Sequence, residues 1–132
     1  MLVGFLLAVA GVLIGGLATH FLSKDLARRN EFNQASKEFI SAFQKELARL
    51  RVDSASIYDI IYPARIRHME ASHIFRRHLK CDDLKRFRQA WSEYYVLTPS
   101  NQISKDKHED KDEDRILLTE KIEKLFEFAK YK

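Results

Sequence analysis

The sequence predicts an all-α protein in which a single N-terminal transmembrane helix is followed by a small helical bundle. All four glycines lie within residues 1–22, and the rest of the chain contains two prolines, Pro63 and Pro99. A sheet protein needs more turn-forming residues than that. Apolar residues after position 22 also recur at steps of three and four, which is the period of an amphipathic helix. About 110 residues follow the apolar segment, enough for one domain with one core.

Residues 1–22 predict a membrane anchor because they contain no Lys, Arg, Asp or Glu. At about 1.5 Å per helical residue they extend for about 33 Å, which suffices to cross a hydrocarbon layer of about 30 Å. A cleaved signal peptide is the alternative, since Gly16, Leu17 and Ala18 form the small-x-small pattern of a cleavage site. The lack of a positive n-region before the apolar run favours a retained anchor.

The cations next to the anchor predict its orientation. Lys24, Arg28 and Arg29 follow the apolar segment, whereas only the terminal amine precedes it. By the positive-inside rule, the N-terminus then lies outside and residues 23–132 form a cytoplasmic domain at the inner membrane of a bacterial-type cell. Cys81 is the only cysteine, so no intramolecular disulfide is possible, as expected in the cytoplasm. The two carboxylates that follow it oppose a thiolate, which predicts an inert thiol.

Two glycines of the anchor predict self-association. Gly11 and Gly15 form a GxxxG unit, and Gly4 with Ala8 adds a small-x3-small step on a neighbouring face. Small residues at this spacing let two membrane helices approach closely enough for tight van der Waals packing. A chance occurrence is the alternative, since glycine is frequent in membrane helices.

The first helix of the domain is predicted over residues 24–51. Nothing between Leu22 and Leu26 ends a helix, so it can continue the anchor without a break. One stripe at helical spacing marks its buried face, formed by Phe32, Ser36, Phe39, Phe43, Leu47 and Leu50.

A second helix is predicted over residues 54–80, with Asp53 as its N-cap. Its stripe keeps one phase through Pro63, which predicts one kinked helix and comprises Ile57, Ile61, Ala64, His68, Ala71, Phe75 and Leu79. The alternative is a break at Tyr62, with Pro63 opening a new helix, a position that proline tolerates well.

Two further helices are predicted over residues 83–96 and 115–131. Asp82 or Asp83 caps the first of them, which presents Leu84, Phe87, Trp91 and Tyr94 on one face. The other presents Leu118, Ile122, Leu125 and Ala129. Residues 98–114 between them are charge-dense and without apolar period, which predicts a mobile loop.

Four spaced patterns resemble a loose group of small uncharacterised bacterial proteins. The patterns are F-x3-F-x3-L in the first helix of the domain, H-x2-A-x3-F from His68, F-x2-A-W-x-E-Y from Phe87 and the closing I-x2-L-F-x-F-A-K. The resemblance implies an N-terminal membrane anchor with a helical cytoplasmic body. It carries no assigned activity.

Catalytic, cofactor and metal motifs are not visible, so a non-enzymatic protein is expected. Glu70 and His73 have the i,i+3 spacing of di-metal bundles, but the sequence has no second copy of the motif. Three alternating aspartates, Asp110, Asp112 and Asp114, start like a calcium loop, but Arg115 stands where glycine is required. A body without glycine also excludes a Gly-rich phosphate loop.

Two features remain as candidates for function. Residues 65–88 contain eight cations against three acids, and the cations are Arg65, Arg67, Arg76, Arg77, Lys80, Lys85, Arg86 and Arg88. This basic face either binds anionic lipid, an acidic partner or nucleic acid, or is a solvated helix surface. Lipid ranks before nucleic acid because no nucleic-acid-binding motif is present. His68 lies on an apolar stripe, which predicts a buried, neutral imidazole with a hydrogen bond to a neighbouring helix.

The whole pattern predicts a membrane-anchored interaction or scaffolding protein that associates with itself and with an unidentified protein. The alternative is a tethered module whose basic face, residues 65–88, binds anionic lipid or nucleic acid.

Overall fold

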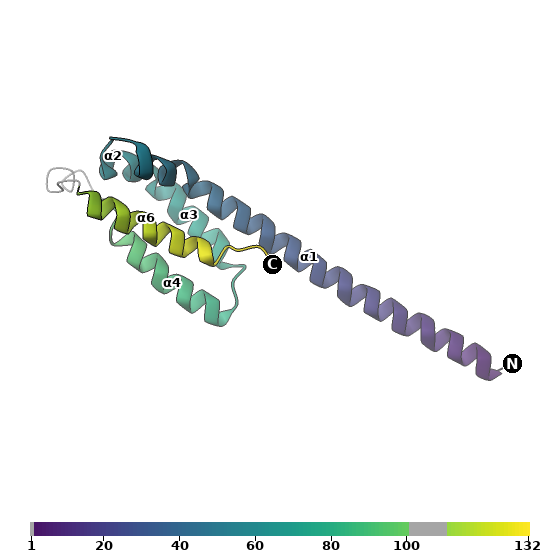
Figure 1. Ribbon diagram of the computed structural model, residues 1–132. Helices are drawn as coiled ribbons and strands as arrows, with labels where there is room; N and C mark the ends of the chain where they lie inside the picture. The colour runs from purple at the N-terminus through teal and green to yellow at the C-terminus, as the bar shows by residue number, and fades with distance from the viewer. Residues whose placement is uncertain (1, 101–110) are drawn as a thin grey trace.

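A computed structural model describes the backbone of residues 2–100 and 111–132, and the side chains of the first helix from residue 15 onward. All regular structure in these ranges is helical, which confirms the all-α class and the helical bundle. The long helix α1, Leu2–Val52, contributes its C-terminal half to a bundled body and projects from it with its N-terminal half (Figure 1). Both predicted segments, 1–22 and 24–51, thus share one unbroken helix from Leu2.

The predicted fold class needs a correction at the N-terminus. Among the described residues, no helix combines the length and apolar character that crossing a membrane requires. The transmembrane helix is therefore removed from the fold class. Most of the predicted anchor, residues 1–14, lies outside the described side chains.

The second predicted helix is divided at its proline. It consists of α2, Ile57–Ile61, the 3-10 turn η1, Tyr62–Ala64, and α3, Arg65–Arg76. Pro63 stands at the start of η1, where its missing N–H leaves no hydrogen bond unmade. The structure therefore interrupts the predicted helix at Tyr62, but Pro63 opens a 3-10 turn and the next α-helix begins at Arg65.

The cap of α2 differs from the prediction. Ser56, not Asp53, is the N-cap, and its Oγ accepts the Asp59 amide at 3.1 Å. The Asp53 carboxylate instead accepts the Ala55 amide at 3.0 Å and the Arg49 Nε at 2.9 Å. These two bonds lower the pKa of Asp53. Asp53 thus closes the turn after α1 instead of opening the next helix.

The remaining helices begin earlier than the sequence predicts. α4 runs over Cys81–Tyr95 behind Lys80, which makes no side-chain cap bond, so Asp82 and Asp83 lie in the first turn, where carboxylates favour the positive helix end. α6 runs over Asp112–Glu127 and has three acids in its first turn. Of the predicted mobile loop, residues 101–110 lie outside the described residues.

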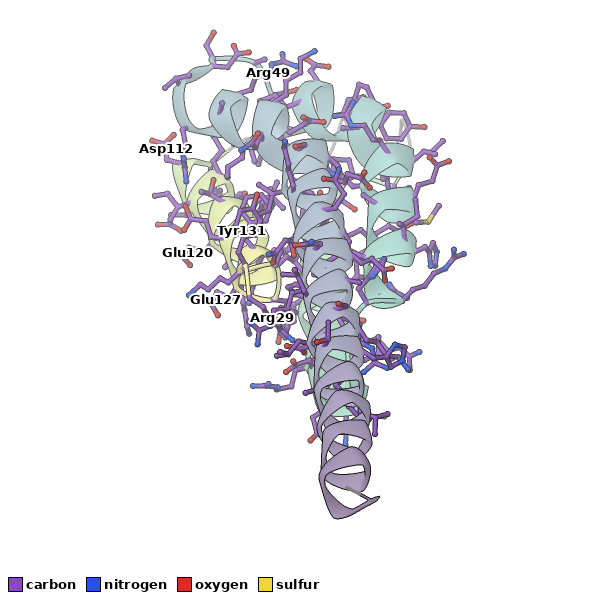
Figure 2. The ribbon with its side chains drawn as sticks, turned by 90° about the vertical axis from the view of Figure 1, so that its right-hand side faces the viewer. Arg29, Arg49, Asp112, Glu120, Glu127 and Tyr131 are labelled. Carbon is purple, nitrogen blue, oxygen red and sulfur yellow. The ribbon has the colours of Figure 1, made fainter. Side chains whose placement is uncertain are left out.

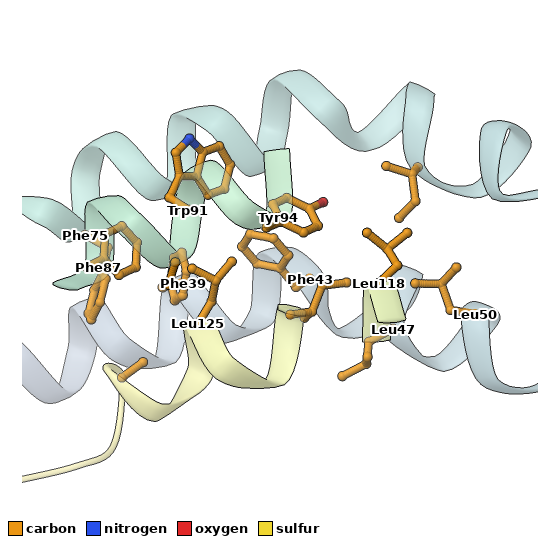
Figure 3. Packing of buried hydrophobic residues seen from close by; sticks show 14 of the residues in the cluster. Phe39, Phe43, Leu47, Leu50, Phe75, Phe87, Trp91, Tyr94, Leu118 and Leu125 are labelled. Carbon is orange, nitrogen blue, oxygen red and sulfur yellow. The ribbon is translucent and has the colours of Figure 1, made fainter. Parts of the chain in front are cut away.

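The core lies where α1, α3, α4 and α6 meet (Figure 3). Phe39 of α1 is at its centre: its ring stacks on Phe75 of α3 at 4.7 Å and meets the edge of Phe87 of α4 at 5.7 Å between centroids. Leu118 and Leu125 of α6 are fully buried in the same core, Leu125 beside Phe39 and Leu118 toward Leu47 (Figure 3). Each predicted stripe thus faces the same core, so the helices are held by shared apolar burial.

Candidate functional site

Three members of the predicted basic face are used by the fold itself. The Arg65 guanidinium lies 4.6 Å above the Tyr95 ring and donates to the Tyr95 hydroxyl and to the Ser100 carbonyl. Arg76 is half-buried, with its guanidinium 6.0 Å from the ring centres of Phe87 and Trp91, and burial lowers its pKa. Arg67 contacts a buried carboxylate, as described below. These arginines cover aromatic rings and satisfy internal acceptors.

The other five cations of this face lie on the surface. Arg86 pairs with Asp83 one turn away. Arg77, Lys80, Lys85 and Arg88 are exposed, and none of them forms an ion pair with a residue that the structure describes. They occupy the end of α3, the α3–α4 turn and the first half of α4. The face predicted over residues 65–88 is therefore reduced to this corner.

The α3–α4 corner lies at the end of the body from which α1 projects (Figure 1). The chain terminus lies there too, because the Lys132 amide donates to Asn33 Oδ1 at 2.9 Å and the Asn33 amide donates to the Lys132 carbonyl at 3.2 Å. Arg29 marks the level at which α1 leaves the body, and Arg49 lies near the opposite end (Figure 2).

We call this region, residues 24–31, 77–88 and 127–132, the basic end. It contains ten Lys or Arg and five Asp or Glu, a surplus of +5, whereas the whole chain has a net charge of +4. The rest of the molecule is therefore close to neutral, and the positive charge is concentrated at one end.

The projecting half of α1 leaves large apolar side chains uncovered, both within the basic end and before it. Leu17, Phe21, Leu22 and Leu26 are each more than half exposed. Phe21, Phe32 and Phe43 stand eleven residues apart, about three helical turns, so they share one side of α1. That side is buried from Phe32 onward. The body-facing stripe of α1 thus continues into a part of the helix that no described residue covers.

The glycines predicted for helix association lie in the same half of α1. Gly15 is exposed, and apart from its chain neighbours and the local helix backbone no atom of the described residues lies within 4 Å of the position that a Cβ would take. Gly11 belongs to the helix, but its surroundings lie outside the described side chains. The structure therefore leaves the space beside Gly15 open.

His68 is buried in the body, between α1 and α4. Its imidazole stacks on Phe43 at 4.0 Å between ring centres, and its Nδ1 lies 2.7 Å from the Tyr94 hydroxyl. Its Nε2 lies 3.2 Å from Glu46 Oε1 without hydrogen-bond alignment, and the Arg67 guanidinium contacts the same carboxylate from the surface. A carboxylate facing Nε2 favours the tautomer protonated there, so Nδ1 accepts from Tyr94.

The environment of His68 holds the imidazole neutral. Burial lowers the pKa of His68 to about 4, and the nearby charge of Arg67 acts in the same direction. The pKa of the Tyr94 phenol is raised, also by burial. With an exposed fraction of 1%, His68 offers no nitrogen to a substrate. Its role is structural: it stacks on Phe43 of α1 and hydrogen-bonds the Tyr94 hydroxyl of α4.

The weaker motifs do not assemble into a site. Glu70 and His73 are both exposed on α3, and the described residues contain no cluster of three or more side chains suited to holding a metal ion. Cys81 is an exposed free thiol.

Sequence reasoning missed the role of Arg115 at the start of α6. Its guanidinium donates to the carbonyls of Arg49, Asp53 and Ala55, at 3.2, 2.6 and 2.6 Å, and its Nε donates to Leu50 at 3.2 Å. The last carbonyls of a helix lack intrahelical donors and carry negative partial charge, which a guanidinium satisfies. Arg115 thus closes the C-terminal end of α1 from a position more than 60 residues away.

Comparison with known proteins assigns no relative: no family model, curated protein or solved structure matches the chain.

Proposed function

We propose that this chain is a non-catalytic helical interaction protein that binds an anionic lipid surface through its basic end. The observation that supports the proposal is that two features lie at the same end of the molecule. The cations that the fold does not use lie at the same end as the exposed apolar half of α1. A lipid surface offers the matching order of layers, anionic head groups first and acyl chains beneath them.

Electrostatics alone make such a contact favourable. Each Lys or Arg near an anionic leaflet contributes about 1 kcal/mol. The surplus of +5 at the basic end is in the range of the clusters of about four to eight cations that recognise anionic lipids. Leu17 and Phe21 add apolar area at the boundary between head groups and acyl chains. This binding mode requires no membrane-spanning helix.

Nucleic acid fits the same charges less well. Its phosphates would attract the basic end, but a duplex offers no apolar layer for the side chains of α1. Lipid therefore accounts for both features, whereas nucleic acid accounts for one.

Self-association is the second candidate. The exposed apolar side chains beside the open space at Gly15 favour it, since a second helix could cover them. The charge distribution opposes parallel pairing of two projecting helices, because it brings two basic ends together. Sedimentation velocity of the full chain tests this candidate: a monomer at all concentrations excludes it.

Vesicle co-sedimentation tests lipid binding. The full chain is mixed with vesicles of phosphatidylcholine alone or with added phosphatidylglycerol. We expect binding to the anionic vesicles only, and we expect it to weaken as salt is raised. Replacing three exposed cations of the corner, Arg77→Gln, Lys80→Gln and Lys85→Gln, should weaken binding by about tenfold or more.

A matched variant controls for net charge. Lys37→Gln, Lys45→Gln and Lys111→Gln remove the same three charges from exposed positions outside the basic end, and this variant should bind nearly as the wild type does. Equal loss in both variants, or equal binding to neutral vesicles, would contradict lipid recognition by the basic end.

A further inference from the structure

A second surface lies on the flank of the body, in a groove of about 210 Å³ between α1 and α3. Its floor is apolar and consists of Ala35 and Phe39 of α1 with Ala71 and Phe75 of α3. Ile74, half exposed, forms its apolar lip. The two helices run side by side along the body (Figure 1).

The walls of this groove are acidic although the chain as a whole is basic. Glu38 of α1 and Glu70 of α3 line it from its two sides, and both are exposed. Glu38 accepts one bond, from Gln34 at 3.0 Å. Within the described residues, neither carboxylate forms an ion pair. Two uncompensated carboxylates thus flank an apolar floor.

Arg67 is the only cation among the described residues that line the groove. Its guanidinium is held by the Glu46 carboxylate, and its Nε donates to the Ala42 carbonyl at 3.3 Å. The charge of Arg67 is therefore neutralised by the buried Glu46 carboxylate. Glu38 and Glu70 keep their negative charge and can attract a cation from outside the chain.

Two more apolar side chains of α3 are exposed outside the groove. Ile66 and Met69 are exposed on this helix, about two turns and about one and a half turns before Ile74. Exposed apolar residues grouped next to a groove are typical of a protein contact surface.

We propose that the α1–α3 groove binds an amphipathic helix of another protein that carries an apolar ridge between Lys or Arg side chains. The ridge packs on Phe39, Ala71 and Ile74, and the flanking cations pair with Glu38 and Glu70. A helix suits this groove because its walls are two helices, whose side-chain ridges accept a third helix and offer no strand edge. A second copy of the chain suits the groove less. The exposed apolar helix of that copy is joined to its own basic end, and docking this helix in the groove brings the basic ends of the two copies together.

Fluorescence anisotropy with two synthetic helical peptides tests this surface without lipid. Both peptides carry the same ridge of leucines; one has lysines on both flanks and the other has glutamates. With the full chain, we expect the lysine peptide to bind and the glutamate peptide to bind at least about tenfold more weakly. The double variant Glu38→Gln, Glu70→Gln should weaken binding of the lysine peptide by about tenfold.

A matched control separates the groove from general charge attraction. Glu113→Gln with Glu120→Gln removes two exposed carboxylates of α6, and this variant should bind the lysine peptide as the wild type does. Ile74→Asp should abolish binding through the apolar lip. Circular dichroism melts of each variant show that the fold is intact, since all these side chains are exposed.

Three results would overturn the assignment. They are equal binding of both peptides, equal loss in the two double variants, and a dimer in sedimentation velocity that Ile74→Asp dissociates, which would make a second copy the occupant. The peptide readout contains no lipid, so its failure is distinguishable from failure of vesicle binding.

Discussion

The two halves of α1 form one continuous helix, but one half is packed in the body and the other is exposed. From Phe32 to Leu50, the helix buries an apolar stripe against α3 and α6, whereas from residue 15 to 31 every described side chain is exposed. The stripe itself does not change phase, since Phe21 precedes Phe32 by three turns. Burial in one half and exposure in the other therefore reflect what the chain supplies to cover the helix. The first half holds the body together, and the second is free to contact something else.

The largest expected effect contrasts two phenylalanines of the two halves. Phe39→Ala removes a ring at the centre of the aromatic core and should lower the free energy of unfolding by about 3–5 kcal/mol. Phe21→Ala changes an exposed position, so its effect should stay within about 0.5 kcal/mol. Urea unfolding followed by circular dichroism measures both. Similar losses in the two variants would mean that the projecting half also packs on the body.

The pH dependence of the free energy of unfolding tests whether His68 is neutral in the folded body. Because burial puts the pKa of His68 at about 4 in the folded state and 6.5 is its ordinary value, the unfolded state binds the proton more readily. The contribution of the neutral imidazole to the free energy of unfolding is therefore fully present above about pH 6.5. It is lost as the pH falls toward 4, by about 3 kcal/mol in all. Arg67 already neutralises Glu46, the carboxylate that would otherwise favour the charged imidazole.

His68→Leu supplies the comparison for this titration. The variant leaves the Tyr94 hydroxyl and the Glu46 carboxylate without the imidazole, so it should be less stable than the wild type at pH 7 by about 1–3 kcal/mol. Its stability should also change less between pH 7 and 4. Urea unfolding at several pH values measures both quantities, and identical pH profiles for the two proteins would remove His68 as the titrating group.

Arg115 belongs to the body and is expected to contribute to its stability. Arg115 donates four hydrogen bonds to carbonyls at and just after the end of α1, and Arg115→Ala should cost about 2 kcal/mol because these acceptors lose their donors. The loss should appear in thermal or urea unfolding. A variant as stable as the wild type would show that water replaces the guanidinium at no cost.

Arg29 gives the smallest expected effect. It pairs with Asp25 at 3.0 Å on the projecting half, and both side chains are 59% exposed. Exposed pairs contribute about 0–1 kcal/mol, so Arg29→Ala should change the free energy of unfolding by less than about 0.5 kcal/mol. A larger loss, measured in the same urea titration, would place Arg29 in the body.

Helical periodicity alone was enough to predict most of the core. Phe39, Phe43, Phe75, Phe87 and Leu125 were all placed on apolar stripes, and all are buried. The ends of the helices were less predictable, because Asp53 and Ser56 both have capping side chains and only the path of the turn decides between them.

Contacts between distant segments could not be predicted from spacing. The link from Arg115 to the end of α1 depends on how α6 packs, and the partition of the basic face depends on where Tyr95 and Trp91 place their rings. The α1–α3 groove likewise exists only once the two helices are paired. The predicted membrane-spanning helix is wrong for a different reason, since no helix among the described residues qualifies as a membrane span.

The double variant Leu17→Ser, Phe21→Ser tests most directly whether the projecting half of α1 binds lipid while the other half stabilises the body. Vesicle co-sedimentation and urea unfolding are measured on the same preparation of the full chain. We expect binding to anionic vesicles to weaken by about tenfold or more, because two apolar contacts with the lipid are lost, while the free energy of unfolding stays within about 0.5 kcal/mol of wild type. Unchanged vesicle binding, or a loss of stability above about 1 kcal/mol, would contradict this division.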